Sequence, residues 1–437
     1  MSDHLELTIE RPVAGGRMIA RHEGRVVFVA GGIPGERVSA RIERRSRQSI
    51  WATVTEVHEA SPDRREPVCD PACGGSTFAH IQYERQRALK QQILVDAFRR
   101  LARLTVGPPA VAASPEQGYR LRARFHTDGT RLGFYREGTH TICEAASTGQ
   151  LRPEATTAAQ ALFDALGLRR ADCAGVTVSE NVAGTGRVVH LEPRERARLD
   201  DVADLIAAVT TGGELSVSGV TTLVRGAVRT IVGEDAVQDD DMALWGAGSA
   251  FGGRVRWRRR APVFFQANRF LIGALVQQVL DAVVDETVAD LYAGVGLFAV
   301  ALAARGSRVS AIEGEPFAAE DLDANAAPYD RLTVVHASVE DAVRQPQADS
   351  VGTVVLDPPR SGASPEALAG LIRWRPRRIV YVSCDPPTLA RDAARLVTAG
   401  YHLDGLHAFD LFPNTPHVEA VTVFDLRARG GPSSEST

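Results

Sequence analysis

The sequence lacks the features of a secreted, disulfide-rich or membrane-spanning protein. Its five cysteines, at positions 69, 73, 143, 173 and 384, are odd in number and widely spread, which argues against a disulfide scaffold. No apolar run approaches the roughly 20 residues that a membrane-spanning helix requires. The first residues, MSDHLELTIERPV, contain no hydrophobic core of a signal peptide. We therefore expect a cytoplasmic protein with no membrane contact.

An excess of positive charge, the usual signal of a nucleic-acid-binding chain, is also absent. The net charge is −4, so any nucleic-acid partner must be bound through a local basic surface. At 437 residues the chain exceeds what one ordinary core holds, and two or three domains are expected. The content of 44% hydrophobic and 24% charged residues is typical of globular domains.

The first two regions of the chain differ in their residue pattern. In residues 1–60, alternating apolar and polar positions between glycine turns predict a small OB-like antiparallel β-barrel. Residues 65–255 start with a proline- and cysteine-rich connector and then mix helices with strand pairs, which predicts a central α+β domain. Within it we expect an amphipathic helix over 83–104 and a hairpin over 119–142.

Residues 256–428 predict a third domain of the α/β class. A basic strand and a helix over about 270–284 come first, and from residue 287 strands alternate with helices. This alternation predicts a parallel, Rossmann-like sheet with helices on both faces. Two strands joined by a loop close the domain as an antiparallel hairpin. The remaining residues, 429–437, predict a disordered tail.

A glycine turn after the first strand of this third domain predicts a cofactor site. Asp290 ends that strand, and Gly294 and Gly296 let the backbone turn and approach a ligand. Glu313 ends the next strand, where an acid usually hydrogen-bonds a ribose. Position 299 holds Ala299 in place of the third glycine of dinucleotide enzymes, an accepted variant, so NAD binding stays open. The terminal hairpin resembles the sheet edge of S-adenosylmethionine methyltransferases and favours methyl transfer.

Cys384 lies at a second strand-to-helix corner. The apolar run 379–382 predicts a buried strand, and Pro386 and Pro387 end it because proline lacks the N–H that a sheet requires. Chemistry in α/β folds is concentrated at such corners. Taken alone, the thiol is either a nucleophile or a small buried filler.

Six motifs together resemble one known family, the RNA uracil-5-methyltransferases with an N-terminal TRAM domain. They are GGIPGERV (31–38), FFQAN (264–268), DLYAGVGLF (290–298), LDPPRSG (356–362), YVSCDPPTLARD (381–392) and FPNTPHVE (412–419). Their order and spacing are similar to the family's over nearly the whole chain. The family has Asn after the nucleophile, and this chain has Asp385.

The resemblance implies a reaction and a role for each matching residue. Carbon 5 of uracil is a poor nucleophile until a thiolate adds to carbon 6, and a base must later remove the proton from carbon 5. The implied nucleophile is Cys384 and the implied base is Glu419. Arg360, together with Asp357, would line the pocket and polarise the uracil edge. The implied cofactor, S-adenosylmethionine, would be bound by Gln266, Tyr292, Gly294, Glu313 and Asp357, with Gln266 contacting either the cofactor or the base.

The resemblance also raises the question of a metal cluster. Family members often hold an iron–sulfur cluster on four cysteines, and the matching residues are Cys69, Cys73, Ser76 and Cys143. A fully ligated cluster needs four thiolates, and Ser76 replaces one. Two interpretations remain: a cluster with an oxygen or non-protein fourth ligand, or a vestigial site whose cysteines now only pack. Cys173 matches no family position and is expected to be structural.

Two arginine-rich stretches are the local candidates for RNA contacts. They are YRLRARF (119–125) and RVRWRRR (254–260), and arginine binds phosphate through its bidentate fork. The alternative is that alternating arginines mark the solvent face of a sheet. The target base must be in a loop or flipped out to reach a cysteine.

The resulting prediction is a monomeric RNA methyltransferase that forms 5-methyluridine in tRNA or ribosomal RNA through a covalent cysteine adduct. One alternative is an NAD(P)-dependent oxidoreductase on the same fold. The other is a non-catalytic RNA-binding or folding factor, for which Cys384 would be dispensable.

Overall fold

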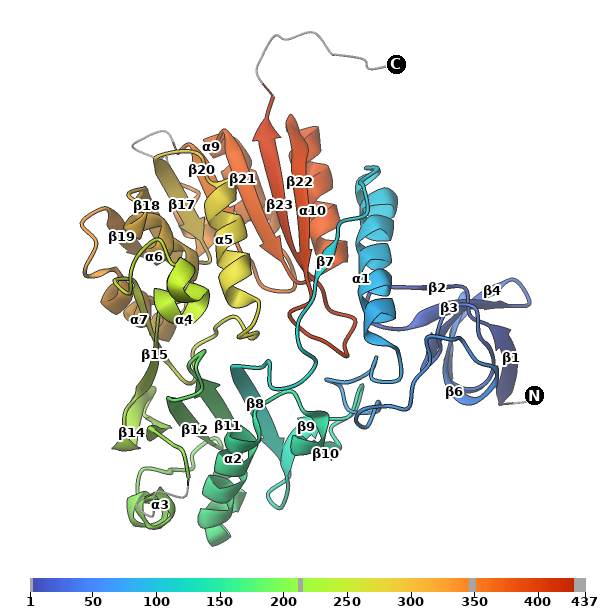
Figure 1. Ribbon diagram of the computed structural model, residues 1–437, viewed down its shortest axis with the longest axis horizontal. Coiled ribbons are helices and arrows are strands. Elements are labelled where there is room, and N and C mark those ends of the chain that lie inside the picture. The colour runs from blue at the N-terminus through green and yellow to red at the C-terminus, as the bar shows by residue number, and fades with distance from the viewer. Residues whose placement is uncertain (1–2, 211–214, 346–350, 428–437) are drawn as a thin grey trace. The chain divides into compact units, whose positions relative to one another are not determined.

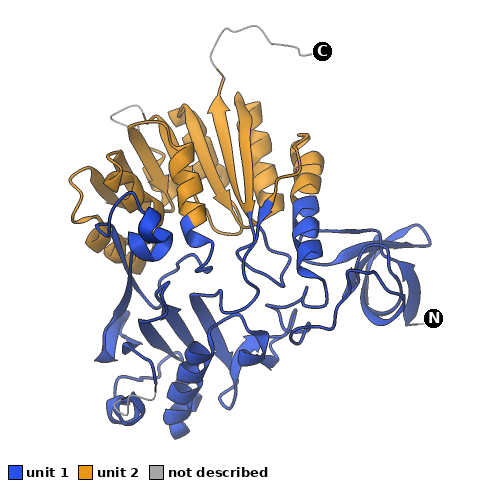
Figure 2. Cartoon of the chain, in the orientation of Figure 1, with its two compact units in different colours: residues 1–93, 111–273, 409–418 blue, residues 94–110, 274–408, 419–437 orange. Residues whose placement is uncertain are grey.

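A computed structural model describes residues 3–210, 215–345 and 351–427. The chain forms two compact units (Figure 2). Unit 1 comprises Met1–Ile93, Val111–Gly273 and Phe409–Val418, and unit 2 comprises Leu94–Ala110, Ala274–Ala408 and Glu419–Thr437. The sequence placed a boundary at residue 256, whereas residues 256–273 group with unit 1. The reason is that the strand beginning at residue 256 pairs with an earlier strand of that unit. The predicted tail, 429–437, lies outside the described residues.

The N-terminal part of unit 1 is a six-stranded sheet that curls around its own core (Figure 1). Its order is β1-β5-β6-β4-β3-β2, and only the β4–β6 pair is parallel among its described pairings. Leu7, Val27, Val38 and Ile50 are buried inside it. The predicted small barrel is confirmed, with these bounds: β1 (His4–Thr8), β2 (Arg11–Pro12), β3 (Met18–His22), β4 (Arg25–Ala30), β5 (Arg37–Arg45) and β6 (Ser49–Glu59).

One helix follows the connector, as predicted. It is α1 (Tyr83–Ala97), and a single π-helical turn, η1 (Phe98–Ala102), continues it. Arg103, in the left-handed conformation with φ 56°, ends this turn. A short strand, β7 (Val111–Ala112), comes next.

The central part of unit 1 is a seven-stranded sheet of order β10-β9-β8-β11-β12-β13-β14. The predicted hairpin is formed by β8 and β9, with Asp128 capping the turn between them. Apolar side chains of the sheet and of helices α2 and α3 form one core. The bounds are β8 (Arg122–Thr127), β9 (Leu132–Tyr135), β10 (Ile142–Glu144), η2 (Ala146–Thr148), α2 (Pro153–Ala165), η3 (Gly167–Asp172), β11 (Cys173–Glu180), β12 (Arg187–Pro193), α3 (Ala203–Thr210), β13 (Gly219–Val224) and β14 (Ala227–Gly233).

A two-stranded ribbon completes unit 1. The basic strand β16 (Arg256–Arg260) pairs antiparallel with β15 (Ala236–Asp240), in which Asp239 lies opposite Trp257 and Asp240 opposite Arg256. The helical segments α4 (Asp241–Trp245) and η4 (Gly246–Gly248) lie between these strands in the sequence.

Unit 2 is the predicted Rossmann-like domain. Its sheet has the order β19-β18-β17-β20-β21-β23-β22, in which β17 to β21 are parallel and β23 runs antiparallel to β21. The strand order reverses at β17 and β20, and ligands bind at such a switch point, beyond the carboxyl ends of the strands. The bounds are α5 (Ile272–Ala282), β17 (Thr287–Leu291), α6 (Leu297–Ala304), β18 (Arg308–Glu313), α7 (Pro316–Ala326), β19 (Leu332–His336), α8 (Val339–Ala342), β20 (Thr353–Leu356), α9 (Pro365–Trp374), β21 (Arg378–Ser383), α10 (Pro386–Thr398), β22 (Tyr401–Phe409) and β23 (Glu419–Leu426).

Helix length and hydropathy also bear on the membrane question. Among the helices that the structure describes, none combines the length and the apolar character needed to cross a bilayer.

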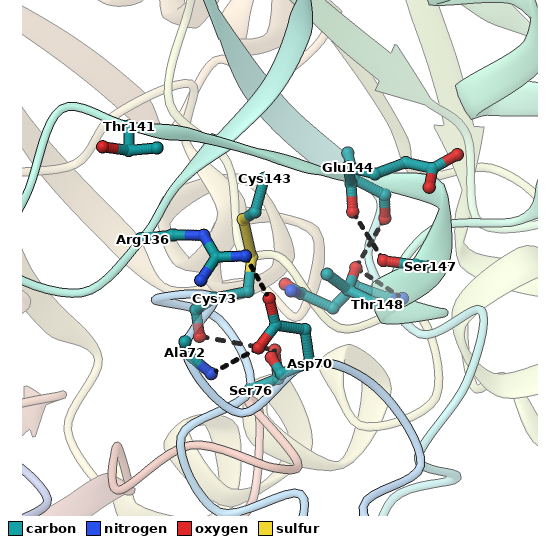
Figure 3. Close-up of a disulfide and its surroundings, with 12 residues drawn as sticks. Asp70, Ala72, Cys73, Ser76, Arg136, Thr141, Cys143, Glu144, Ser147 and Thr148 are labelled. Atoms are coloured by element: carbon teal, nitrogen blue, oxygen red, sulfur yellow. Dashed lines mark hydrogen bonds and ion pairs between the residues drawn. A yellow bond between two sulfur atoms is a disulfide. The ribbon is translucent and has the colours of Figure 1, made fainter. Parts of the chain in front are cut away.

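A disulfide joins the connector to the central sheet of unit 1 (Figure 3). It links Cys73 to Cys143 of β10, residues that are 70 positions apart in the sequence. Two neighbouring contacts support it: Arg136 forms an ion pair with Asp70 at 3.0 Å, and the Gly74 N–H donates to the Tyr135 carbonyl. The sequence argued against a disulfide scaffold and did not predict this single bond, because only the folded hairpin brings the connector beside β10.

The disulfide predicts a difference in thiol count. Denatured, unreduced protein should show three reactive thiols, those of Cys69, Cys173 and Cys384, and reduced protein should show all five. Cys143→Ser should lower the free energy of unfolding by about 2–4 kcal/mol, because a long loop is released in the unfolded chain. Thiol titration and denaturant unfolding measure the two effects, and five thiols without reduction would contradict the bond.

Candidate active site

The turn after β17 has the backbone geometry of a ligand-binding loop. Gly294 and Gly296 adopt positive φ angles of 57° and 88°, as the predicted glycine turn requires. Tyr292 has φ 61°, a conformation that is costly for a residue with a bulky side chain and is found at functional sites. A Cβ atom at Gly294 would meet no heavy atom within 4 Å, so this turn faces open space. The turn therefore leaves room for a ligand beside its backbone.

Glu313 is oriented by backbone donors at the end of β18. The Gly294 N–H donates to one carboxylate oxygen at 2.7 Å, and the Glu315 N–H donates to the other at 2.7 Å. These bonds fix the carboxylate next to the glycine turn. Such a group accepts hydrogen bonds from ribose hydroxyls.

Buried acidic groups accumulate beside this turn. Asp290 is fully buried, and burial, followed by the negative charges of Asp357 and Glu313, raises the pKa of its carboxyl well above the usual range. The sequence marked Asp290 only as a strand end, although its position before the glycines was a usable signal. Several carboxyl groups around one open turn favour a cationic ligand.

Cys384 lies at the corner between β21 and α10, as predicted. The residue is only partly buried. Burial, followed by the negative charge of Glu419, raises the pKa of the Cys384 thiol to about 12, and the Arg360 guanidinium opposes this shift. Asp385, the departure from the family's Asn, caps α10 by accepting a hydrogen bond from the Thr388 N–H at 2.9 Å. Asp and Asn perform this capping role equally well, which accounts for the departure.

The sheet sets Glu419 opposite Cys384. In the antiparallel pairing of β21 with β23, Ser383 lies opposite Ala420. Continued by one residue, the same register places Cys384 opposite Glu419, the first residue of β23. Directly opposed residues project to the same face of a sheet. Thus two residues 35 positions apart in the sequence are brought together by strand pairing.

Glu419 is nearly inaccessible, with 3% of its surface exposed. Burial, followed by the negative charge of Asp357, raises the pKa of its carboxyl well above the usual range, and the Arg360 guanidinium opposes this shift. A carboxyl group of this kind accepts a proton more readily than an exposed one.

A cavity of about 350 Å³ lies beside the glycine turn. It is lined by Tyr292, Glu340, Pro359, Ser361, Gly362, Ala363, Ser364, Pro365, Arg391 and Arg395. The Ser364 hydroxyl donates to Glu340 at 2.6 Å. Glu340 was missed by the sequence analysis, although it follows the third parallel strand, β19, at the same edge of the sheet.

Gln266 is the one residue predicted to bind the cofactor or the uracil that lies in unit 1. It is buried, with 6% of its surface exposed. Asn268, from the same FFQAN motif, has a clear structural role. Its amide donates to the Ser114 hydroxyl and the Leu411 carbonyl, and its side-chain oxygen accepts from the Phe270 and Leu271 N–H groups.

Several arginines predicted to contact RNA have internal partners. Arg259 is fully buried in an ion pair with Asp239, and Arg122 donates to the Ala261 and Pro262 carbonyls. Arg124 pairs with Glu192. Arg259 and Arg122 are therefore held inside unit 1 and do not form a solvent-facing row, whereas Arg124 is exposed, as that alternative expected. Contact of these arginines with phosphate stays a prediction.

The cysteines proposed as cluster ligands gather in unit 1 but do not fit a four-thiolate cluster. The sulfurs of Cys73 and Cys143 are bonded to each other. Burial raises the pKa of the Cys69 thiol, which makes a hydrogen bond with Ser76 that opposes the shift. Thiolates are the ligands of such clusters, and this arrangement offers one unbonded thiol and one hydroxyl.

Comparisons with known proteins confirm the resemblance. The family model described as tRNA (Uracil-5-)-methyltransferase matches residues 249–427, and the TRAM domain model matches residues 3–55. An uncharacterized RNA methyltransferase of Streptomyces coelicolor is 35% identical, over 96% of this chain and 92% of that protein. The 23S rRNA (uracil(1939)-C(5))-methyltransferase RlmD of Pseudomonas putida is 33% identical, over 96% and 93%.

A solved structure shares the fold. The tRNA (uracil-54, C5)-methyltransferase of Pyrococcus abyssi, in complex with S-adenosyl-L-homocysteine, matches with a TM-score of 0.72 and 24% identity, over 96% of this chain and 99% of that one. Both relatives named above are RNA methyltransferases, and each is more than 30% identical to this chain over nearly its full length. This similarity decides against the oxidoreductase and the non-catalytic factor. The chain belongs to the TRAM-domain family of S-adenosylmethionine-dependent RNA uracil-5-methyltransferases.

Proposed function

We propose that this protein forms 5-methyluridine in RNA through a covalent adduct between Cys384 and carbon 6 of the target uracil. The proposal rests on the register of β21 and β23. Among the described residues, this register sets Cys384, the only cysteine of the site, opposite the buried carboxyl group of Glu419. A nucleophile and a base on the same face of one sheet match the two steps that carbon-5 methylation requires.

The residues of the glycine turn fit S-adenosylmethionine. Glu313 would accept hydrogen bonds from the ribose, Tyr292 and Glu340 would line the adenine side of the cavity, and Gly294 leaves room for the ligand. Asp290 and Asp357 would offset the positive charge of the sulfonium. When bound, this cofactor would supply an electrophilic methyl group for carbon 5 and would leave as S-adenosyl-L-homocysteine once its bond from sulfur to that methyl group breaks.

Cys384 would act first on the uracil ring. Its thiol releases its proton to solvent, and the thiolate forms a bond from Sγ to carbon 6 while the electron pair of the 5,6 double bond moves toward carbon 5 and the 4-carbonyl. Carbon 5 can then bond to the methyl group. Arg360 would stabilise the enolate oxygen, because its guanidinium already lowers the pKa of both Cys384 and Glu419.

Glu419 would complete the reaction by taking the proton from carbon 5. The electron pair of that C–H bond restores the double bond, and the Sγ–C6 bond breaks to release Cys384 as a thiolate. Burial of Glu419 keeps bulk water away from the proton and makes its carboxylate a stronger base. Glu419 then releases its proton to solvent and the Cys384 thiolate takes one up, so the enzyme returns to its starting state with 5-methyluridine as product.

Ribosomal RNA is the first substrate to test. The relative from Pseudomonas putida, with 33% identity over most of both chains, is named for 23S rRNA. The solved structure named for tRNA is more distant, at 24% identity. The TRAM barrel of unit 1 would bind the RNA, and Gln266 would contact the cofactor or the base.

Deletion of the gene tests this function. Mass spectrometry of digested RNA should show the loss of one 5-methyluridine from 23S rRNA. Wild-type protein should restore it, and Cys384→Ala should not. Loss from tRNA would correct the RNA class, and unchanged 5-methyluridine in all RNA would contradict the proposal.

Glu419→Gln tests the base. The amide cannot accept the proton from carbon 5, so a covalent RNA–protein adduct should accumulate and turnover should fall by about 100-fold or more. Denaturing gels with labelled RNA measure the adduct, and single-turnover kinetics measure the rate. Cys384→Ala is the control that forms no adduct. Wild-type turnover by Glu419→Gln would contradict the assignment.

The raised pKa of Cys384 predicts slow alkylation of the free enzyme. Below a pKa of about 12 the thiol is protonated at neutral pH. Its reaction with iodoacetamide should therefore rise about tenfold per pH unit between pH 7 and 10. Arg360→Ala should slow it further, because the cation that favours the thiolate is lost. Arg373→Ala, at the end of α9, is the matched control. Peptide mass spectrometry follows Cys384, and fast alkylation independent of pH would contradict the prediction.

A further inference from the structure

Lys90 is the single lysine of the sequence, and the other 49 of its 50 lysine and arginine residues are arginine. It lies on α1 and is fully buried. Its ammonium forms an ion pair with Asp410, which is also fully buried, and donates a second hydrogen bond to the Phe412 carbonyl at 3.0 Å. An ammonium is a compact point charge, whereas a guanidinium is a wide planar fork. The buried site at position 90 therefore suits lysine, which occurs nowhere else in the sequence.

The two acceptors of Lys90 belong to residues 410–418, the segment that joins β22 to β23. Residues 409–418 group with unit 1, although the strands that they join group with unit 2. Burial lowers the pKa of the Lys90 ammonium, and the Asp410 carboxylate opposes this shift. A buried charge that loses its partner is strongly unfavourable, so the ion pair strongly favours this placement of the segment.

A second polar contact of α1 holds the middle of the segment. Gln86 is one turn before Lys90 and is also fully buried. Its side-chain amide donates to Asn414 Oδ1 at 2.9 Å, and the Asn414 N–H donates back to Gln86 Oε1 at 2.8 Å. Asn414 has φ 63°, and its carbonyl accepts from the Phe78 N–H at 2.8 Å. Three hydrogen bonds, two with Gln86 and one with Phe78, thus fix the backbone turn at Asn414.

Further contacts extend these anchors along the segment. The Asn268 amide donates to the Leu411 carbonyl, and Gly16 of the barrel lies so close to Pro416 that an added Cβ would approach its ring to 2.8 Å. Other parts of unit 1 therefore contact or lie close to residues 410, 411, 412, 414 and 416 of the segment. Three residues after Pro416, the chain reaches Glu419.

We propose that Lys90 and Asp410 are positioning residues for Glu419. They hold the 410–418 segment in place, and this segment leads directly into Glu419, the first residue of β23, which the pairing with β21 sets opposite Cys384. This inference rests on the proposed function, in which Glu419 is the base. It adds that polar contacts of α1, far away in the sequence, set the rate of the deprotonation step.

The separate steps of the reaction test this role. Lys90→Met should form the covalent RNA adduct with the wild-type rate constant per folded molecule, because Cys384 is unaffected. Breakdown of the adduct should slow by roughly 10- to 100-fold, since a small displacement of the base is enough for such a loss. A merely structural role would lower formation and breakdown together, in proportion to the folded fraction. Equal loss in both steps would overturn the proposal.

Two further variants keep the test decisive if Lys90→Met folds poorly. Lys90→Met/Asp410→Leu removes both charges and should recover stability. It should still break down the adduct slowly, because the contact with the Phe412 carbonyl remains lost. Arg187→Met is the matched control, since Arg187 forms a buried ion pair with Glu180 elsewhere in unit 1. This variant should be less stable, but it should keep the wild-type ratio of the rate constants for adduct formation and adduct breakdown. Wild-type breakdown by the double variant would overturn the proposal.

The single lysine also provides a direct probe of the segment. Endoproteinase Lys-C cleaves after lysine and has Lys90 as its one site in this chain. Wild-type protein should resist cleavage, and Asp410→Asn and Asn414→Ala should be cut faster, in the order of their adduct-breakdown defects. Failure of Glu419→Gln to trap an adduct would refute the base itself. A normal breakdown rate in variants that Lys-C cuts rapidly would refute only the positioning role.

Discussion

The pairing of β23 between β21 and β22 is the constraint on which the site depends. It sets Glu419 opposite Cys384, at the edge where the carboxyl ends of β17, β18 and β20 also meet. This arrangement concentrates negative charge: Asp357 and Glu419 are close enough to raise the pKa of Cys384, and Arg360 is the cation that opposes them. Burial and these charges favour the protonated form of the Cys384 thiol. In the mechanism proposed above, Cys384 would therefore gain its reactivity with the cationic cofactor and the substrate.

The carboxyl edge of the sheet also explains how the residues proposed to bind the cofactor are held. Glu313 is oriented by two backbone N–H groups, and the strained Tyr292 directly precedes the glycine turn that leaves space for a ligand. These contacts are made by the backbone, so they depend on the turn geometry and tolerate changes in most neighbouring side chains. The tolerance is visible at Asp385, which replaces the family's Asn and caps α10 through the same kind of hydrogen bond.

Buried ion pairs give unit 1 a second kind of constraint. Arg187 with Glu180, Arg259 with Asp239 and Lys90 with Asp410 all lie inside it. Each pair favours one arrangement strongly, because separating the partners would leave a buried charge. The arginine-rich stretches that looked like phosphate-binding surface in the sequence are partly explained by such pairs. The Cys73–Cys143 disulfide ties the connector to strand β10 of the same unit.

Periodicity and motif order were enough to determine the parallel sheet, the N-terminal barrel, the glycine turn and the strand-to-helix corner at Cys384, because these features depend on neighbours in the sequence. The partner of each side chain was not determined in this way. Whether Arg259 faces phosphate or Asp239, whether Cys143 meets Cys73, and whether Lys90 meets Asp410 depend on residues 20, 70 and 320 positions away. Only the tertiary structure decides such contacts, because burial and long-range pairing are properties of the packed chain and leave no periodic signal in the sequence.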